Sequence, residues 1–141
     1  MPNHHLRLKN DLAEIQRLEE SLAAFGSANG LPRETLLDLH LIFEEILTNI
    51  IKYGYDDDHE HFIDIDMVAG NDAMLFEIVD DGRPFNPLEK PAPDLDTPLM
   101  ERPIGGLGLH LVRHLTDAIH YVAKGGKNIL RFTKKHARRD R

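Results

Sequence analysis

The sequence has no cysteine and no tryptophan, and only 6% of its residues are aromatic. Without cysteine, disulfide bonds, thiolate metal ligands and a cysteine nucleophile are all excluded. No apolar run reaches the roughly 18 to 20 residues that are needed to cross a bilayer. The first residues also lack the basic and then apolar pattern of a signal peptide. We therefore expect a cytoplasmic protein that does not insert into a membrane.

An excess of positive charge is missing too, because the formal net charge is -7. Nucleic acid is therefore not expected as the main partner. The one basic cluster closes the chain, and we interpret residues 135–141 as a solubilising tail. The full length of 141 residues, 41% of them hydrophobic, fits one globular domain, which we place at residues 1–134.

The spacing of apolar residues predicts the order of the secondary structure. Residues 4–9 alternate weakly, which favours a short edge strand. Period-3.6 patterns predict a helix from about Asn10 to Gly26 and a second helix from Pro32 to Tyr53. Further elements are expected as strands at 62–68 and 74–79, a helix at 105–116, and a hairpin of strands at 118–123 and 128–133. This order predicts an α+β fold in which helices cover one face of an antiparallel-leaning sheet.

A long stretch without periodicity separates the second predicted strand from the third helix. Residues 80–104 hold six of the eight prolines in the chain. A segment of this length inside a compact domain is usually a functional flap or a disordered loop. Lys90 and Arg102 are candidates for contacts with phosphate oxygens, although each is equally compatible with a solvated surface charge.

The second predicted helix carries a row of polar side chains within an apolar run. Glu45 and Asn49 are four residues apart and Lys52 is three further on, so all three share one side of the helix. Asn49 offers an uncharged oxygen suited to Mg²⁺, and Glu45 could accept a proton from a hydroxyl group or orient a water molecule. The alternative is an exposed polar strip on an amphipathic helix.

Two glycine-containing motifs follow. Asp80 and Gly82 stand directly after an apolar strand, where a carboxylate can accept a hydrogen bond from the amine of adenine, although Asp-Gly is also an ordinary turn. Gly105, Gly106, Leu107 and Gly108 lead into a helix, so their backbone N–H groups could face an anion. A glycine-rich hinge without a ligand is the alternative. The histidine pairs His59/His61 and His110/His114 lack a third ligand at a recognisable spacing, so a structural zinc site is not expected.

The order of these motifs resembles the GHKL ATPase superfamily, which includes DNA gyrase, the mismatch-repair ATPases and the catalytic domains of histidine kinases. Within it, the chain looks most like the small stand-alone anti-sigma-factor serine/threonine kinases. Four segments carry the likeness: residues 49–55, 80–87, 105–112 and 128–134. Pro84, where many members have a second glycine, and Ile50, where alanine is frequent, depart from the wider pattern.

The resemblance implies a Bergerat fold, an α+β two-layer sandwich with a mixed, mostly antiparallel sheet, helices packed on one face and a long ATP lid at about residues 83–104. It implies ATP and Mg²⁺ as cofactors, with Asn49 as the metal ligand and Glu45 as the catalytic base. The expected nucleotide contacts are Asn49, Lys52, Asp80, Gly82, Gly105, Gly106, Leu107, Gly108 and, in support of the adenine pocket, Thr133.

The function implied by the resemblance is an ATP-dependent protein serine/threonine kinase of the anti-sigma-factor type. Its substrate would be a small anti-anti-sigma-like (STAS) protein, a sigma factor would be a further partner, and a homodimer is reasonable. The alternative is a non-catalytic, ATP-binding regulatory switch. A detached histidine kinase catalytic domain is less favoured, because the first predicted helix has no histidine to accept a phosphoryl group.

Overall fold

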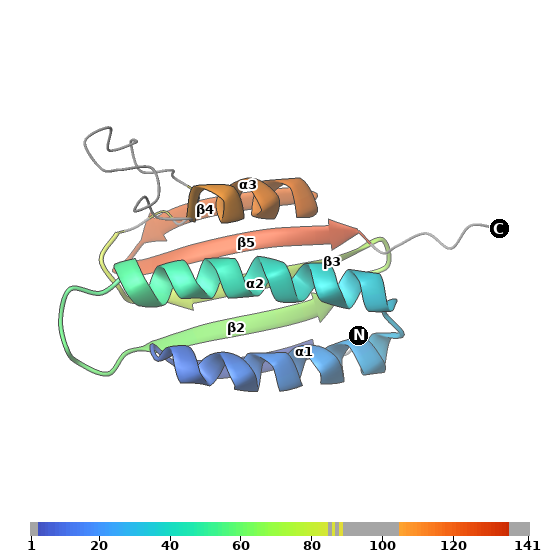
Figure 1. The fold of residues 1–141 in the computed structure, drawn as a ribbon, viewed down its shortest axis with the longest axis horizontal. Helices are drawn as coiled ribbons and strands as arrows, with labels where there is room; N and C mark the ends of the chain where they lie inside the picture. The colour runs from blue at the N-terminus through green and yellow to red at the C-terminus, as the bar shows by residue number, and fades with distance from the viewer. Residues whose placement is uncertain (1–2, 85, 87, 89–104, 136–141) are drawn as a thin grey trace.

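The structure, a computed structural model, describes residues 3–84, 86, 88 and 105–135. In this part of the chain, helices lie on one face of a single sheet (Figure 1). The strands are β1 (Asn3–Lys9), β2 (Phe62–Ala69), β3 (Ala73–Asp80), β4 (Ala118–Lys124) and β5 (Lys127–Lys135), and the helices are α1 (Ile15–Asn29), α2 (Arg33–Tyr53) and α3 (Gly105–Leu115), with a 3₁₀ turn at Leu12–Glu14 ahead of α1.

The five strands pair in the order β1-β2-β3-β5-β4. The α+β two-layer fold is confirmed, and β1 is an edge strand as predicted. The sheet was expected to be mixed and mostly antiparallel, and in the described residues all four pairings are antiparallel. Because β3 is the central strand, its last residue, Asp80, is flanked by neighbouring strands on both sides.

The core lies between the sheet and the helices, because side chains alternate between the two faces of each strand. In β2 and β3 every second residue is buried, and α2 lies over the middle of the sheet (Figure 1). Four buried phenylalanines connect the layers. The ring centroids of Phe76 lie 5.7 Å from Phe25, 5.5 Å from Phe43 and 4.9 Å from Phe132.

The first helix was expected to end at Gly26 and the run of residues 27–30 that follows it, and the structure places the end at the last residues of that run. Gly26 is buried inside α1, which continues to Asn29. A glycine within a helix costs about 1 kcal/mol relative to alanine, an amount that tertiary packing readily outweighs. The helix ends at Gly30, whose φ of 61° is the left-handed conformation that glycine adopts without strain. Pro32 is the N-cap of α2.

Several helices and strands begin or end at the same end of the molecule. The C-terminal end of α2, the end of β3, and the starts of β5 and α3 lie together (Figure 1). Most of the predicted lid lies outside the described residues, as does the predicted tail beyond Lys135, the last residue of β5. In the described part of the chain, no helix is both long and apolar enough to span a membrane.

Candidate functional site

The polar row of α2 is only partly exposed. Asn49 is 8% exposed, Glu45 is half-buried, and the Asn49 amide nitrogen donates a hydrogen bond to Glu45 Oε1 over 3.3 Å. The helix itself produces this contact, because residues four apart lie one turn above each other. The hydrogen bond uses the nitrogen side of the amide, so the carbonyl oxygen of Asn49 points away from Glu45.

Lys52 and Glu44 occupy different positions on the same helix. Lys52 is exposed in the last turn of α2, where a cation also favours the negative end of the helix dipole. Glu44 is exposed, one step off the face shared by Glu45 and Asn49. The structure therefore brings Lys52 to the same end of the molecule as Asn49.

Asp80 is a buried carboxylate at the end of the central strand. Asp80 is only 5% exposed. Its Oδ1 accepts hydrogen bonds from the Gly82 backbone N–H over 2.9 Å and from Asn128 Nδ2 over 3.0 Å. Burial raises the pKa of Asp80 despite these two hydrogen bonds, because a charge inside the protein loses its hydration. Among the described residues no donor contacts Oδ2, so this oxygen can accept a hydrogen bond from a ligand.

The close packing of the turn after β3 against the end of α2 requires a glycine at position 82. A Cβ atom at this position would lie 2.4 Å from the carbonyl oxygen of Gly54. That oxygen accepts a hydrogen bond from the Arg83 backbone N–H over 2.9 Å, and Arg83 Nε donates to the carbonyl oxygen of Tyr53 over 2.9 Å. The turn after β3 is thus fastened to the end of α2. The close approach that glycine permits is to Gly54, and space for an adenine ring at Gly82 stays a prediction.

Asn128, at the start of β5, is a site residue that the sequence pattern did not reveal. It is 4% exposed and lies opposite Asp80 in the register of β3 and β5. Its amide nitrogen lies 3.0 Å from Asp80 Oδ1, 3.2 Å from the Gly82 carbonyl and 2.9 Å from the Arg83 carbonyl. One amide group therefore holds both the carboxylate and the turn that follows it. Only the strand register could have identified it.

Thr133, which was expected to support the adenine pocket, lies away from Asp80 along β5. It is paired with Leu75 of β3 and with Ala118 of β4, five residues along β5 from Asn128. At about 3.4 Å per residue this separation is roughly 17 Å. The structure does not bring Thr133 to Asp80. Asn128 takes the position next to Asp80 because antiparallel pairing places the start of β5 beside the end of β3.

The glycine-rich segment begins α3. Gly105 is the first helical residue, so the N–H groups of the first turn, which include those of Gly106, Leu107 and Gly108, have no partner within the helix. The start of α3 lies at the same end of the sheet as the end of β3 (Figure 1), whose last residue is Asp80. From the predicted lid, Leu88 is buried, and its carbonyl oxygen accepts a hydrogen bond from Arg113 Nη2 of α3 over 2.8 Å.

These groups suit a nucleotide and one divalent cation. Asp80 Oδ2 could accept a hydrogen bond from an exocyclic amine, and the positive end of α3 would favour a phosphate group. Asn49 supplies one neutral oxygen, which fits Mg²⁺ because this ion keeps several waters and takes few protein ligands. Among the described residues, His, Asp and Glu side chains form no cluster of three that could hold a metal by themselves.

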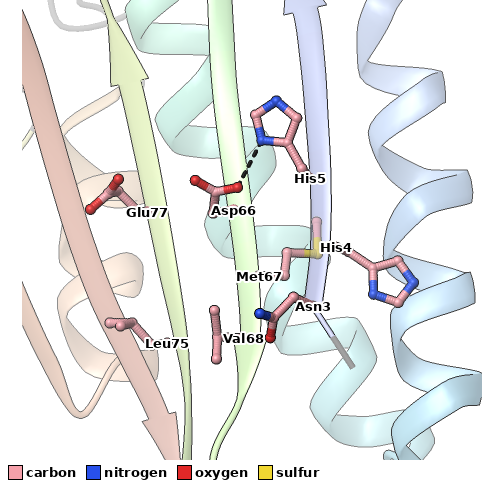
Figure 2. A pocket seen from close by; sticks show the side chains of 8 residues that line it. All are labelled: Asn3, His4, His5, Asp66, Met67, Val68, Leu75 and Glu77. Atoms are coloured by element: carbon pink, nitrogen blue, oxygen red, sulfur yellow. Dashed lines mark hydrogen bonds and ion pairs between the residues drawn. The ribbon is translucent and has the colours of Figure 1, made fainter. Parts of the chain in front are cut away.

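A separate cavity of about 320 Å³ lies over the other end of β1, β2 and β3 (Figure 2). Figure 2 shows His5 and Asp66 on adjacent strands, joined by a hydrogen bond of 2.7 Å from His5 Nδ1 to Asp66 Oδ1. None of the sequence-predicted site residues lines it. The residues that do are Asn3, His4, His5, Asp66, Met67, Val68, Leu75 and Glu77.

Comparison with known sequences identifies the family of the chain. Residues 8–134 match the family model of the histidine kinase-like ATPase domain. The chain is 30% identical over 95 residues to the serine/threonine-protein kinase BtrW of Bordetella bronchiseptica, which covers 67% of each chain. It is 26% identical over 132 residues to the serine-protein kinase RsbW of Listeria monocytogenes, covering 89% of this chain and 81% of that protein.

Solved structures share the fold. The crystal structure of the RsbU and RsbW domains of a Mycobacterium tuberculosis protein superposes with a TM-score of 0.69 at 15% identity, covering all of this chain and 34% of that one. The histidine kinase AdeS of Acinetobacter baumannii gives a TM-score of 0.51 at 16% identity, covering 98% of this chain and 70% of that one. At these identities the likeness concerns the fold alone. The family match over residues 8–134 shows that the chain belongs to the histidine kinase-like ATPase domain family and is a distant homologue of the RsbW and BtrW kinases.

Proposed function

We propose that this protein is an ATP-dependent serine/threonine kinase of the anti-sigma-factor type. The curated relatives that cover most of the chain are named serine or serine/threonine-protein kinases. The substrate that we propose is a small STAS-like anti-anti-sigma protein, with a sigma factor as a second partner. A homodimer and a cytoplasmic location belong to the same proposal.

The residues around the end of the sheet would hold the nucleotide. Asp80 would accept a hydrogen bond from the adenine amine, and the backbone N–H groups of Gly106 and Gly108 would bind phosphate oxygens. Asn49 would contribute an oxygen ligand to Mg²⁺, and Lys52 would approach the phosphates. ATP would supply the phosphoryl group that is transferred.

Glu45 would act on the protein substrate. As the serine oxygen forms its bond to the γ-phosphorus, the bond from that phosphorus to the bridging oxygen breaks and ADP leaves. The serine proton passes to the Glu45 carboxylate. Such reactions depend mainly on positioning and charge neutralisation, which the pairing of Glu45 with Asn49 would favour.

The observation that carries this proposal is the contact between Asn49 and Glu45, 3.3 Å apart, within a helix whose end is hydrogen-bonded to the turn after Asp80. It places a carboxylate beside the metal ligand that we propose.

The test is phosphoryl transfer from labelled Mg-ATP to a purified STAS-like protein. We expect serine labelling by the unaltered protein and a loss of about 10²- to 10⁴-fold in rate with Glu45→Gln, the usual size of a general-base contribution. Glu44→Gln is the matched control, because Glu44 is the exposed neighbour on the same helix. Its rate should stay within about twofold. Equal loss in both variants would contradict the role of Glu45.

The same experiment distinguishes the non-catalytic alternative. Binding of Mg-ATP without any labelled serine would favour a regulatory switch that uses the same site. No binding of Mg-ATP at any pH would contradict both functions.

A further inference from the structure

The loop between α2 and β2, residues 54–61, carries a histidine held between two carboxylates. His61 Nε2 lies 2.8 Å from Asp57 Oδ1, and His61 Nδ1 lies 3.1 Å from Asp81 Oδ1. Asp57 belongs to the same loop, but Asp81 follows Asp80 in the turn after β3. His61 therefore connects the segment that leaves α2 with the turn that carries the proposed adenine contact.

Only a charged imidazole can donate a hydrogen bond to both carboxylates at once. A neutral histidine has one N–H group, whereas the imidazolium has two. Since a carboxylate lies within hydrogen-bond distance of each ring nitrogen, both contacts are hydrogen bonds only when His61 is protonated. In agreement with this geometry, the hydrogen bond to Asp57 raises the pKa of His61 above its usual value of 6.5, and Asp81 adds to the effect.

The ring of His61 is fixed in place by its surroundings. Tyr55 stacks on it, with centroids 4.6 Å apart and an angle of 22° between the planes. The His61 backbone exchanges two hydrogen bonds with Asn10, one from His61 N–H to Asn10 Oδ1 and one from Asn10 N–H to the His61 carbonyl, each 3.0 Å long. The stacking and the backbone hydrogen bonds hold His61 independently of its contact with Asp81.

The charges that face His61 come from its own loop and from the turn. Burial raises the pKa of Tyr55, with further contributions from Asp80, Asp81 and Asp57, so Tyr55 stays neutral at physiological pH. Asn10, from the N-terminal side, adds only neutral contacts. When His61 loses its proton, Asp57 and Asp81 are left as like charges on either side of a neutral ring.

Several hydrogen bonds hold the turn after β3 in the described structure. Asn128 holds the Asp80 side chain and the turn carbonyls, and the backbone and side chain of Arg83 donate to the end of α2. His61 holds Asp81, and among these partners it is the one whose charge changes near neutral pH, since the others are amides, carbonyl groups and a guanidinium. A change of pH near neutrality therefore acts on this turn through His61.

We propose that His61 is a positioning residue for the Asp80–Gly82 turn, and that its protonated form, clamped between Asp57 and Asp81, favours adenine nucleotide binding. This inference rests on the proposed nucleotide site. In this role His61 would act on the turn through Asp81 and not on the phosphates or the transferred proton. The contact between His61 and Asp81 would make nucleotide affinity depend on pH, because Asp81 belongs to the turn that carries the proposed adenine contact.

The direction of the pH effect follows from the protonation of the His61 imidazole. His61 donates hydrogen bonds to both Asp57 and Asp81 below pH 6.5. One of these hydrogen bonds is lost as the pH rises through the pKa of His61, which is above 6.5. Affinity for the nucleotide should therefore fall as pH rises. A pKa change of one unit on binding corresponds to a tenfold change in affinity, so we expect a decrease of up to about tenfold between pH 6 and pH 8.5.

The experiment is isothermal titration of the full chain with Mg-ADP across this pH range. Comparing variants with the unaltered protein removes the contribution of the phosphate's own protonation. His61→Asn should flatten the decrease to less than about twofold. Asp57→Asn removes one carboxylate and leaves the histidine, so it should shift the decrease to lower pH. Asp58→Asn, at an exposed position of the same loop, should keep the unaltered profile.

A second measurement follows the imidazole directly. In NMR titrations, the His61 ring signal is assigned by its loss in His61→Asn. The pKa that it reports should lie above 6.5 and should rise further when Mg-ADP binds. A profile in His61→Asn that matches the unaltered protein would overturn the inference while leaving the nucleotide site intact. An Asp57→Asn variant with an unchanged His61 titration would overturn it as well. Absence of Mg-ADP binding to the unaltered protein would contradict the proposed function itself.

Discussion

At the scale of single residues, the proposed adenine end of the site depends on one amide. Asn128 is almost fully buried, and its nitrogen lies within hydrogen-bond distance of the Asp80 carboxylate and of the carbonyl groups of Gly82 and Arg83. Its Oδ1 accepts a hydrogen bond from the Tyr121 hydroxyl. Asn128 therefore links the side chain and the backbone of the turn to the strand beside it.

Asn128→Ala should remove these contacts and leave the Asp80 carboxylate buried with one donor fewer. We expect the free energy of unfolding to fall by about 1 to 3 kcal/mol, the usual cost of an unsatisfied buried group. Affinity for Mg-ADP should fall as well, because the turn is no longer fixed. Urea denaturation and calorimetric titration measure the two effects.

Thr133→Ala is the control for this prediction. Thr133 is on the same strand and half-buried, but it lies five residues from Asn128. It should leave nucleotide affinity unchanged within about twofold. Loss of affinity in Thr133→Ala, with no loss in Asn128→Ala, would show that the register places the wrong residue at the site.

At the scale of elements, a half-buried lysine fastens two helices to the sheet. Lys134 of β5 donates a hydrogen bond to the carbonyl oxygen of Leu115, the last residue of α3, over 2.7 Å. The same ammonium group lies 3.2 Å from Asp38 Oδ2 of α2, and its side chain is 14% exposed. A cation here also satisfies one of the carbonyl groups that the end of a helix leaves without a partner.

Lys134→Met should weaken the attachment of α3, since the Leu115 carbonyl and Asp38 both lose their partner while the aliphatic length is kept. We expect a loss of about 1 to 3 kcal/mol in the free energy of unfolding. Amide hydrogen exchange in α3 should accelerate more than exchange in β3. Lys124→Met, at an exposed end of β4, is the matched control and should change stability by less than about 0.5 kcal/mol. Uniform acceleration across the sheet and α3 would contradict a local role.

At the scale of the whole molecule, one chain of aromatic contacts joins the two layers. Phe76 of the central strand contacts Phe25 of α1, Phe43 of α2 and Phe132 of β5, and all four are buried. Edge-to-face and stacked pairs at these distances contribute beyond their buried area. The sheet and the helices that carry the site are thus positioned by the same cluster.

Phe76→Ala should leave a cavity at the centre of this cluster. We expect a loss of about 3 to 5 kcal/mol in the free energy of unfolding, a large share of the stability of a typical domain. Phe62→Ala, on the exposed face of β2 at 39% exposure, should cost less than about 1.5 kcal/mol. Thermal and urea denaturation check both. A similar loss of unfolding free energy in the two variants would contradict the central position of Phe76 in the core.

Much of this arrangement was determined by local sequence patterns. Apolar periodicity predicted the order of the helices and strands, because each pattern repeats with the geometry of one element. The contact between Glu45 and Asn49 was also predictable, since a spacing of four residues on a helix fixes it. The motif order from Asn49 through Asp80 to Gly106 was sufficient to predict the family, which is confirmed.

The tertiary structure decided what depends on residues far apart in the chain. The register of β3 and β5 places Asn128 beside Asp80 and moves Thr133 to the other end of the sheet. The packing of the turn against the end of α2 makes Gly82 necessary and brings Asp81 to His61. Local spacing specifies neither, because strand register and loop contacts are set by which surfaces pack together when the whole chain folds.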